Sequence, residues 1–178
     1  MLSPVLAEFN RLHPGVVLEL LTDARLYSLA RREADIAFRI TPFEEADIVS
    51  RRLLRMRYSA YIRRGSPHPA AGDGRDCPLV IMDTSFGGLP DVTWITHTLP
   101  NAPIAARSNN RDVQARLCAL GTGLAVLPIP LGDATPEIER VALGEPPTRD
   151  TWLGYHRDMR HARRVRALID LVVERLAD

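Results

Sequence analysis

The amino-acid sequence predicts an α/β fold made of two lobes, with the chain crossing between them twice. Amphipathic segments with helical spacing alternate with short apolar segments, as expected for helices that cover a sheet. Residues 48–64 alternate in character over a length that can bridge two lobes. The chain can return to the first lobe near residues 149–154. We therefore expect residues 1–61 and 151–178 to form one lobe, and residues 62–150 to form the other.

The first 41 residues predict the order helix, strand, helix, strand. Ser3-Pro4 is a helix opening, because serine can cap a helix and the N–H that proline lacks has no partner in the first turn. Strands are expected at Val16–Leu21 and Ile36–Ile40, with a helix around Arg25–Arg32 between them. This order implies parallel strands, whose C-terminal ends are the usual place of a ligand site in α/β proteins.

The rest of the chain is predicted mainly as strands and loops, with a final helix. Residues 65–76 are rich in glycine and proline, and the chain after Pro128 is rich in loops. The final helix is indicated by apolar residues that recur with helical spacing between Val165 and Leu176. Strands are expected at residues 79–82, 104–106 and 138–143.

One segment, residues 108–128, combines a helix, a glycine stop and a buried strand. Ser108 or Asn109 can cap the helix, and Gly121 lies where a left-handed residue would end it. Leu124–Leu127 is a short apolar run that is typical of a strand covered on both faces. A helix N-terminus with small polar residues is a kind of site that suits an anionic ligand.

The composition describes a globular protein with no general attraction to nucleic acid or membranes. The 178 residues include 46% hydrophobic and 25% charged residues, which is enough to bury a core. The net charge of +1 gives no broad electrostatic attraction to polyanions. The sequence contains neither a signal segment nor a run of about 18 apolar residues, so a cytoplasmic location is the expectation.

The residue types that most catalytic chemistries need are missing or isolated. All 23 basic residues are arginine, which excludes a Schiff-base lysine and a phosphate-loop lysine. The five histidines have no metal-ligand spacing, and the two cysteines lie in unrelated contexts. No nucleophile elbow surrounds a serine. The sequence therefore predicts no catalytic residue, no metal and no cofactor.

Three segments agree in order and spacing with a known family: Leu6–Leu20, Ala34–Ile40, and Asn109–Pro128 with its sequence Ala-Leu-Gly-Thr-Gly-Leu-Ala-Val-Leu-Pro. They resemble the C-terminal effector-binding domain of LysR-type transcriptional regulators. The resemblance implies a type II periplasmic-binding-protein-like fold of two Rossmann-like lobes joined by two crossover strands. It also implies a small anionic effector, a carboxylate, that binds between the lobes, and a homodimer or tetramer that acts on DNA.

The resemblance places the ligand contacts in loops that follow strands. Each loop also has a purely structural interpretation: helix capping near Thr22 and Ser108, a salt-bridged strand end at Arg39, and an ordinary glycine turn after Thr84. A ligand role is favoured over the structural one only in the loop after Thr84. The predicted contacts are Thr22, Asp23, Arg39, Thr41, Thr84, Ser85, Phe86, Ser108 and Asn109.

The chain departs from this family at its start. The resemblance implies that it opens on the helix that normally follows the first strand, so we expect the first strand of the fold to be missing and no helix-turn-helix in these residues. The missing strand should leave neighbouring edges unpaired, which favours association. DNA binding is therefore expected only in a full-length protein that adds a DNA-binding domain. The preferred function is that of an effector-sensing domain, and the alternatives are a stand-alone small-molecule binding protein, a truncated regulator remnant or a small α/β enzyme.

Overall fold

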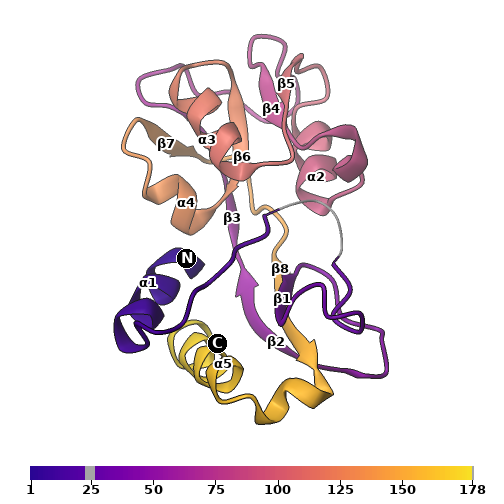
Figure 1. Ribbon diagram of the computed structural model, residues 1–178. Helices are drawn as coiled ribbons and strands as arrows, with labels where there is room; N and C mark the ends of the chain where they lie inside the picture. The colour runs from indigo at the N-terminus through magenta and orange to yellow at the C-terminus, as the bar shows by residue number, and fades with distance from the viewer. Residues whose placement is uncertain (23–26, 178) are drawn as a thin grey trace. The chain divides into compact units, whose positions relative to one another are not determined.

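The computed structural model describes residues 1–22 and 27–177, which form two compact units. The first unit contains Met1–Arg55 and Arg149–Asp178, and the second contains Met56–Thr148 (Figure 1). The chain therefore passes between the units after Arg55 and again after Thr148, and the boundaries expected from the sequence lie after residues 61 and 150. The division into one functional lobe of residues 1–61 and 151–178 and another of residues 62–150 stays a prediction.

The described residues of the first unit form a three-stranded sheet, two α-helices and one short 3₁₀ helix. Its elements are α1 (Leu2–Leu12), β1 (Ile36–Arg39), β2 (Ile48–Met56), β8 (Arg149–His156), the short helix η2 (Arg157–His161) and α5 (Arg163–Leu176). The strand order is β1-β8-β2, and β1 runs antiparallel to β8 with Phe38 opposite Leu153. Helix α1 contacts α5, and Glu8 Oε1 lies 2.7 Å from Arg175 Nη2. The arginine lowers the pKa of the Glu8 carboxyl by hydrogen bonding to it.

Two predicted elements near the N-terminus were wrong. Residues 16–21 form no strand, and residues 27–32, the described part of the second predicted helix, form no helix, with turns at residues 29–32. The side chain of Val17 is 93% exposed and that of Leu20 is 61% exposed. A strand-like sequence needs a hydrogen-bonded neighbour to become a strand, and the described sheet consists of β1, β8 and β2 without a pairing to this segment. The predicted ligand contact Asp23 lies outside the described residues.

Two further expectations about the first unit also require correction. Helix α1 begins at Leu2 with Met1 as its N-cap, so Ser3 lies inside the first turn and does not cap the helix. Strand β1 is antiparallel to its neighbour, not parallel. The reason is that β1 pairs with β8, which returns from late in the chain, and not with the next strand of a strand–helix–strand repeat.

The second unit is built on a five-stranded sheet with the order β5-β4-β6-β3-β7. Its elements are β3 (Tyr58–Arg63), β4 (Leu79–Ile81), the short helix η1 (Thr84–Phe86), α2 (Pro90–Thr98), β5 (Ile104–Arg107), α3 (Arg111–Ala119), β6 (Leu124–Pro128), α4 (Ile129–Asp133) and β7 (Ile138–Val141). Strand β4 is parallel to β5 and β6, whereas β3 is antiparallel to β6 and β7. The single long strand predicted over residues 48–64 is divided into β2 and β3 at Arg57. Helices α2 and α4 were not predicted.

Both faces of the second sheet are buried. On one face, Ile95 and Leu99 of the α2 region belong to a cluster with Leu124, and all three are at most 1% exposed. On the other face, Cys118 of α3 belongs to a cluster with Leu127 and Tyr61, which are equally buried. Neighbouring residues of a strand point to opposite faces, so the apolar run in β6 supplies both cores. This confirms the predicted strand that is covered on both sides.

The transition from α3 to β6 follows the predicted glycine stop. Gly121 has φ of +85°, its N–H donates to the Cys118 carbonyl at 2.9 Å, and the Thr122 N–H donates to the Leu117 carbonyl at 3.0 Å. These two bonds define a Schellman motif, in which glycine takes the left-handed conformation without a steric penalty. The chain then enters β6 directly beside β4, with the Leu124 N–H donating to the Pro78 carbonyl at 2.8 Å.

A polar cluster joins α4 to the sheet of the second unit. The Tyr61 hydroxyl donates to Asp133 Oδ1 at 2.8 Å, and Arg140 of β7 donates to the same carboxylate from Nε at 2.9 Å. Burial, followed by the hydrogen bond to Asp133, raises the pKa of Tyr61 to about 12. The hydrogen bond from Arg140 lowers the pKa of the Asp133 carboxyl. The cluster therefore favours an ionised aspartate and a neutral tyrosine.

Candidate functional site

Two polar loops begin side by side at the C-terminal edge of the parallel strands β4 and β5. Ile81 at the end of β4 lies opposite Arg107 at the end of β5, and the Ser108 N–H donates to the Ile81 carbonyl at 3.0 Å. Arg107 Nη1 also donates to the Met82 carbonyl at 3.3 Å. The C-terminal edge of parallel strands is where α/β proteins usually bind ligands. The predicted contacts Thr84 and Ser108 belong to these two neighbouring loops.

The first loop contains the predicted contacts Thr84, Ser85 and Phe86, which form the short helix η1. Asp83 caps this helix, because its Oδ1 accepts a hydrogen bond from the Ser85 N–H at 3.1 Å. Thr84 and Ser85 are both exposed. The hydroxyl groups of Thr84 and Ser85 are therefore accessible to solvent, on a short helix that is capped by Asp83.

The second loop contains the predicted contacts Ser108 and Asn109, but neither residue caps α3. The cap is Asn110, whose Oδ1 accepts hydrogen bonds from the backbone N–H groups of Asp112 at 2.9 Å and Val113 at 3.2 Å. Ser108 instead accepts from the Asn110 N–H through Oγ at 3.1 Å, which extends the turn by one residue before the helix begins. An anion at this loop would therefore have to use hydroxyl groups and Arg107 rather than the two amides that Asn110 already occupies.

A buried ion pair lies between α2 and α3 in the same unit. Arg111 Nη2 lies 2.5 Å from Asp91 Oδ2, and the Asp91 side chain is only 2% exposed. Arg111 Nη1 donates to the Val126 carbonyl of β6 at 2.9 Å, and its guanidinium lies 5.5 Å from the ring centroid of Tyr58. The residues are 20 positions apart, and the pair was not predicted from the sequence.

The predicted contacts of the first unit have fewer signs of a ligand role. Arg39 donates from Nη2 to the Tyr27 carbonyl at 2.8 Å, lies 3.3 Å from Glu45, and stacks over the Phe43 ring at 4.3 Å. Its side chain is only 10% exposed, which agrees with the structural interpretation of a salt-bridged strand end. Thr22 and Thr41 are exposed, and their proposed ligand role stays a prediction.

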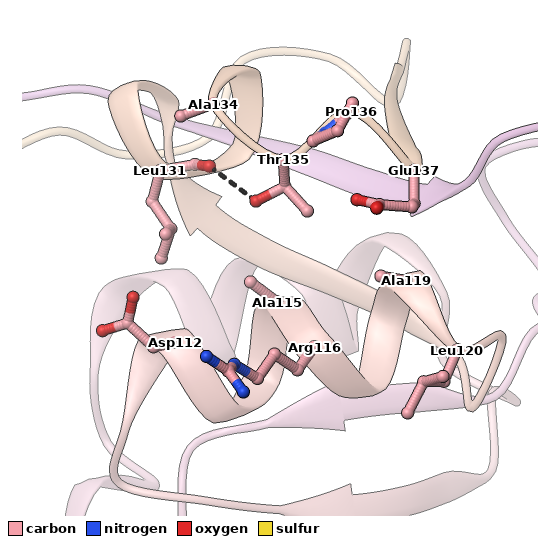
Figure 2. Close-up of a pocket in the computed structure, with 10 residues that line it drawn as sticks. All are labelled: Asp112, Ala115, Arg116, Ala119, Leu120, Leu131, Ala134, Thr135, Pro136 and Glu137. Atoms are coloured by element: carbon pink, nitrogen blue, oxygen red, sulfur yellow. Dashed lines mark hydrogen bonds between the residues drawn. The ribbon is translucent and has the colours of Figure 1, made fainter.

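A surface cavity of about 490 Å³ lies between α3 and the segment that contains α4 and the following loop (Figure 2). Ala115 and Ala119 of α3 line it from one side and Thr135 from the other, and Thr135 Oγ1 donates to the Leu131 carbonyl at 2.9 Å. The cavity contains none of the predicted contacts, and only the spacing of the two alanines along one helix face could have indicated it. Its lining residues are Asp112, Ala115, Arg116, Ala119, Leu120, Leu131, Ala134, Thr135, Pro136 and Glu137.

The described part of the chain lacks two features that would define other classes of site. Among residues 1–22 and 27–177, no group of three or more histidine, cysteine, aspartate or glutamate side chains could hold a metal ion. Over the same residues, no helix combines the length and the apolar character that a membrane crossing requires.

Comparison with known proteins identifies the family. The model of the LysR substrate binding domain matches residues 1–177. The regulatory domain of CrgA, a LysR-type transcriptional regulator from Neisseria meningitidis, is similar with a TM-score of 0.82 and 20% identity, over 99% of this chain and 92% of that chain. The regulatory domain of AphB from Vibrio vulnificus is similar with a TM-score of 0.69 and 19% identity, over 98% of this chain and 90% of that chain.

Full-length regulators are longer than this chain. The chain spans 63% of full-length AphB, a virulence activator from Vibrio cholerae, with a TM-score of 0.72 and 15% identity over 98% of this chain. No curated protein sequence matches the chain. The structural matches confirm the predicted α/β fold, which is that of LysR regulatory domains. Because the family model covers nearly every residue, the chain belongs to the LysR substrate binding domain family.

Proposed function

We propose that the protein binds a small carboxylate as its effector and that the two polar loops of the second unit contact it. The observation that carries this proposal is the meeting of the loops after β4 and β5 at one edge of the sheet. Thr84, Ser85 and Ser108 carry hydroxyl groups that can donate to a carboxylate. Arg107 supplies a positive charge beside the first loop, because its guanidinium donates to the Met82 carbonyl.

Isothermal titration calorimetry with benzoate, hexanoate and succinate should detect binding of at least one acid, with benzamide as the uncharged counterpart of benzoate. A dissociation constant between about 1 μM and 1 mM corresponds to about 4–8 kcal/mol of binding free energy, a range that a few charge-assisted hydrogen bonds and a small apolar contact can supply. Ser108→Ala should weaken the binding of that acid by at least about tenfold, since a hydrogen bond to a charged group is worth about 1.5–3 kcal/mol.

Ser66→Ala is a matched control for this titration. Ser66 follows β3, and β3 runs antiparallel to β6, so Ser66 lies at the opposite edge of the sheet from the two loops. This variant should bind the acid as the wild type does. Flat titrations with every acid, obtained with folded protein, would count against the proposal, and so would an equal loss of affinity in the Ser66 and Ser108 variants.

We further propose that the chain acts as a homodimer or tetramer, which would bind DNA only through a separate DNA-binding domain. Both units carry large apolar side chains that are well exposed, including Leu12 at 60%, Val17 at 93% and Leu120 at 75%. Val113 and Leu120 lie seven positions apart on α3 or directly after it, and therefore near one side of the helix. An effector can change the geometry of such an oligomer only by binding one arrangement more tightly than another.

Sedimentation equilibrium over a range of protein concentrations should show a mass above that of one chain, and Leu120→Asp should shift the protein toward the mass of one chain. Burial of an unpaired carboxylate in an interface is costly, so the dissociation constant should rise by about tenfold or more. Val49→Asp places the same charge on β2, where Val49 is 41% exposed, and serves as the control. A single-chain mass for the wild type at every concentration would reject the oligomer.

A further inference from the structure

The second unit contains a buried amide side chain that the fold alone does not require. Gln114 lies on α3 and is 0% exposed, and the other buried polar side chain among the described residues is Asp91. A buried amide is costly unless its oxygen and its nitrogen both have hydrogen-bond partners. An apolar residue would serve a purely structural role at this position without that cost. The partners of Gln114 therefore indicate what the residue does.

The two ends of the Gln114 amide have different partners. Its Oε1 accepts a hydrogen bond from Arg111 Nη1 at 3.0 Å. Its Nε2 donates to the Ser108 carbonyl at 2.6 Å and contacts Met82 Sδ at 3.1 Å. Arginine can only donate hydrogen bonds, so the amide oxygen must face Arg111 and the amide nitrogen must face Ser108 and Met82. The orientation of the amide is thus fixed by its neighbours.

Gln114 connects the starting points of both candidate ligand loops. Met82 directly precedes the Asp83 cap of the first loop, and Ser108 begins the second loop. Arg111 extends the connection, because it is paired with Asp91 at the start of α2 and bonded to the Val126 carbonyl of β6. One buried network therefore contacts the ends of two strands and the starts of two helices.

We propose that Gln114 is a positioning residue of the ligand site, which holds the loops after β4 and β5 in one relative position. This inference rests on the proposed function, since it takes these loops to be the ligand contacts. Gln114 itself is fully buried and does not reach a ligand in solvent. Gln114 preorganises the hydroxyl groups of Thr84, Ser85 and Ser108. Because these groups are already ordered in the free protein, less conformational entropy is lost when the ligand binds.

Two substitutions separate the donor from the acceptor of the amide. Gln114→Met keeps a long side chain of similar volume but removes both hydrogen-bonding groups. Gln114→Glu keeps an oxygen toward Arg111 and replaces the donor that faces the Ser108 carbonyl with a second oxygen. Amide hydrogen exchange of residues 84–85 and 109–110, measured without ligand, should become at least about tenfold faster in both variants, because both release the Ser108 carbonyl.

The acid found by calorimetry, or benzoate if several acids bind, should bind each Gln114 variant about tenfold more weakly. The matched control is Cys118→Ala, because Cys118 is also 0% exposed on α3 but its Sγ contacts the Tyr61 carbonyl and not the loops. This variant should lower the thermal midpoint of unfolding and leave both the loop exchange and the acid affinity unchanged. If Gln114 had a purely structural role, its variants would behave like Cys118→Ala: the thermal midpoint would fall, while the loop exchange and the acid affinity would not change.

The outcomes for the site and for Gln114 can be told apart. Loop exchange that matches the Cys118→Ala control in both Gln114 variants overturns the positioning role, whether or not an acid binds. Loss of acid affinity without faster loop exchange also overturns it. Failure of every acid to bind the wild-type protein rejects the proposed function, while the exchange measurements still decide whether Gln114 positions the loops. If Gln114→Met does not fold, Gln114→Glu carries the same exchange test.

Discussion

Replacement of Gly123 by alanine should destabilise the second unit by about 3 kcal/mol or more, because overpacking against a backbone that cannot move is among the costliest single changes. A Cβ at this position would lie 2.4 Å from the Pro78 carbonyl oxygen and 2.8 Å from the Pro78 carbonyl carbon. Both atoms belong to the backbone just before β4, and the same Pro78 carbonyl accepts a hydrogen bond from the Leu124 N–H. Relief of the clash would therefore require β6 to move away from β4.

Urea unfolding followed by tryptophan fluorescence tests this expectation. Trp94 lies in the second unit and Trp152 in the first, so a Trp152→Phe background makes the signal specific to the second unit. Gly88→Ala is the control, because a Cβ on Gly88 would meet no atom within 4 Å, and this variant should change the free energy of unfolding by less than about 0.5 kcal/mol. If Gly123→Ala unfolded at the same urea concentration as the wild type, β4 and β6 would not approach each other as closely as described.

Replacement of Arg111 by methionine should cost about 3–5 kcal/mol, because removal of one member of a buried ion pair leaves a charge without its counter-ion. Arg111 lies 2.5 Å from Asp91, whose side chain is 2% exposed. The same substitution removes the hydrogen bond to the Val126 carbonyl at 2.9 Å. Replacement of both partners, as Asp91→Leu with Arg111→Met, should recover much of the loss, since the buried charge is then gone as well.

A double-mutant cycle measured by urea unfolding gives the coupling free energy of the Asp91–Arg111 pair directly. Arg166→Met is the comparison, because Arg166 pairs with Asp170 on the surface of α5, where the two side chains are 72% and 67% exposed. Exposed pairs of this kind contribute about 0–1 kcal/mol. Equal losses for Arg111→Met and Arg166→Met would contradict the view that burial makes the Asp91–Arg111 pair important.

The parts of the fold that could be predicted are those with local signals. The turn after α3 was predicted because Gly121 alone satisfies the steric demand of a left-handed residue there, and the observed φ of +85° agrees. The cap of α3 was misplaced because serine and asparagine both cap helices well, and residues 108–110 are Ser-Asn-Asn. Only the path of the chain out of β5 determines which of the three residues becomes the cap.

Other parts were missed because their cause is not local. Helix α2 contains Val92, Thr93, Ile95, Thr96 and Thr98, which are β-branched residues with low helix propensity. Its helical form is stabilised by burial of Ile95 and Val92 against the sheet, although Pro90 in the first turn is a helix-start signal that could have been used. Residues 16–21 show the opposite case, where a strand-like sequence forms no strand in the described structure.

The candidate site was predicted only in outline. The loops after residues 82 and 107 were expected from the alternation of strands and helices, and the register of Ile81 opposite Arg107 brings them together. The network behind them joins Asp91, Arg111 and Gln114 with Ser108 and the Val126 carbonyl. Ser108, Arg111 and Gln114 lie within seven residues of one another, but Asp91 and Val126 are 20 and 15 positions from Arg111 and meet it only through tertiary packing. No periodicity or motif could have indicated that arrangement.

The exposed segment at residues 16–21 has a consequence for proteolysis. Backbone without regular structure and with exposed side chains is the preferred substrate of proteases, and Val17 and Leu20 are 93% and 61% exposed in such a segment. Cleavage there would cut the peptide link between α1 and the remainder of the first unit. Phe9 of α1 is 0% exposed, and Glu8 is paired with Arg175 of α5. These non-covalent contacts would hold α1 on the first unit even after the peptide bond is cut. A nicked chain could thus keep its folded first unit while its N-terminal helix became a separate peptide.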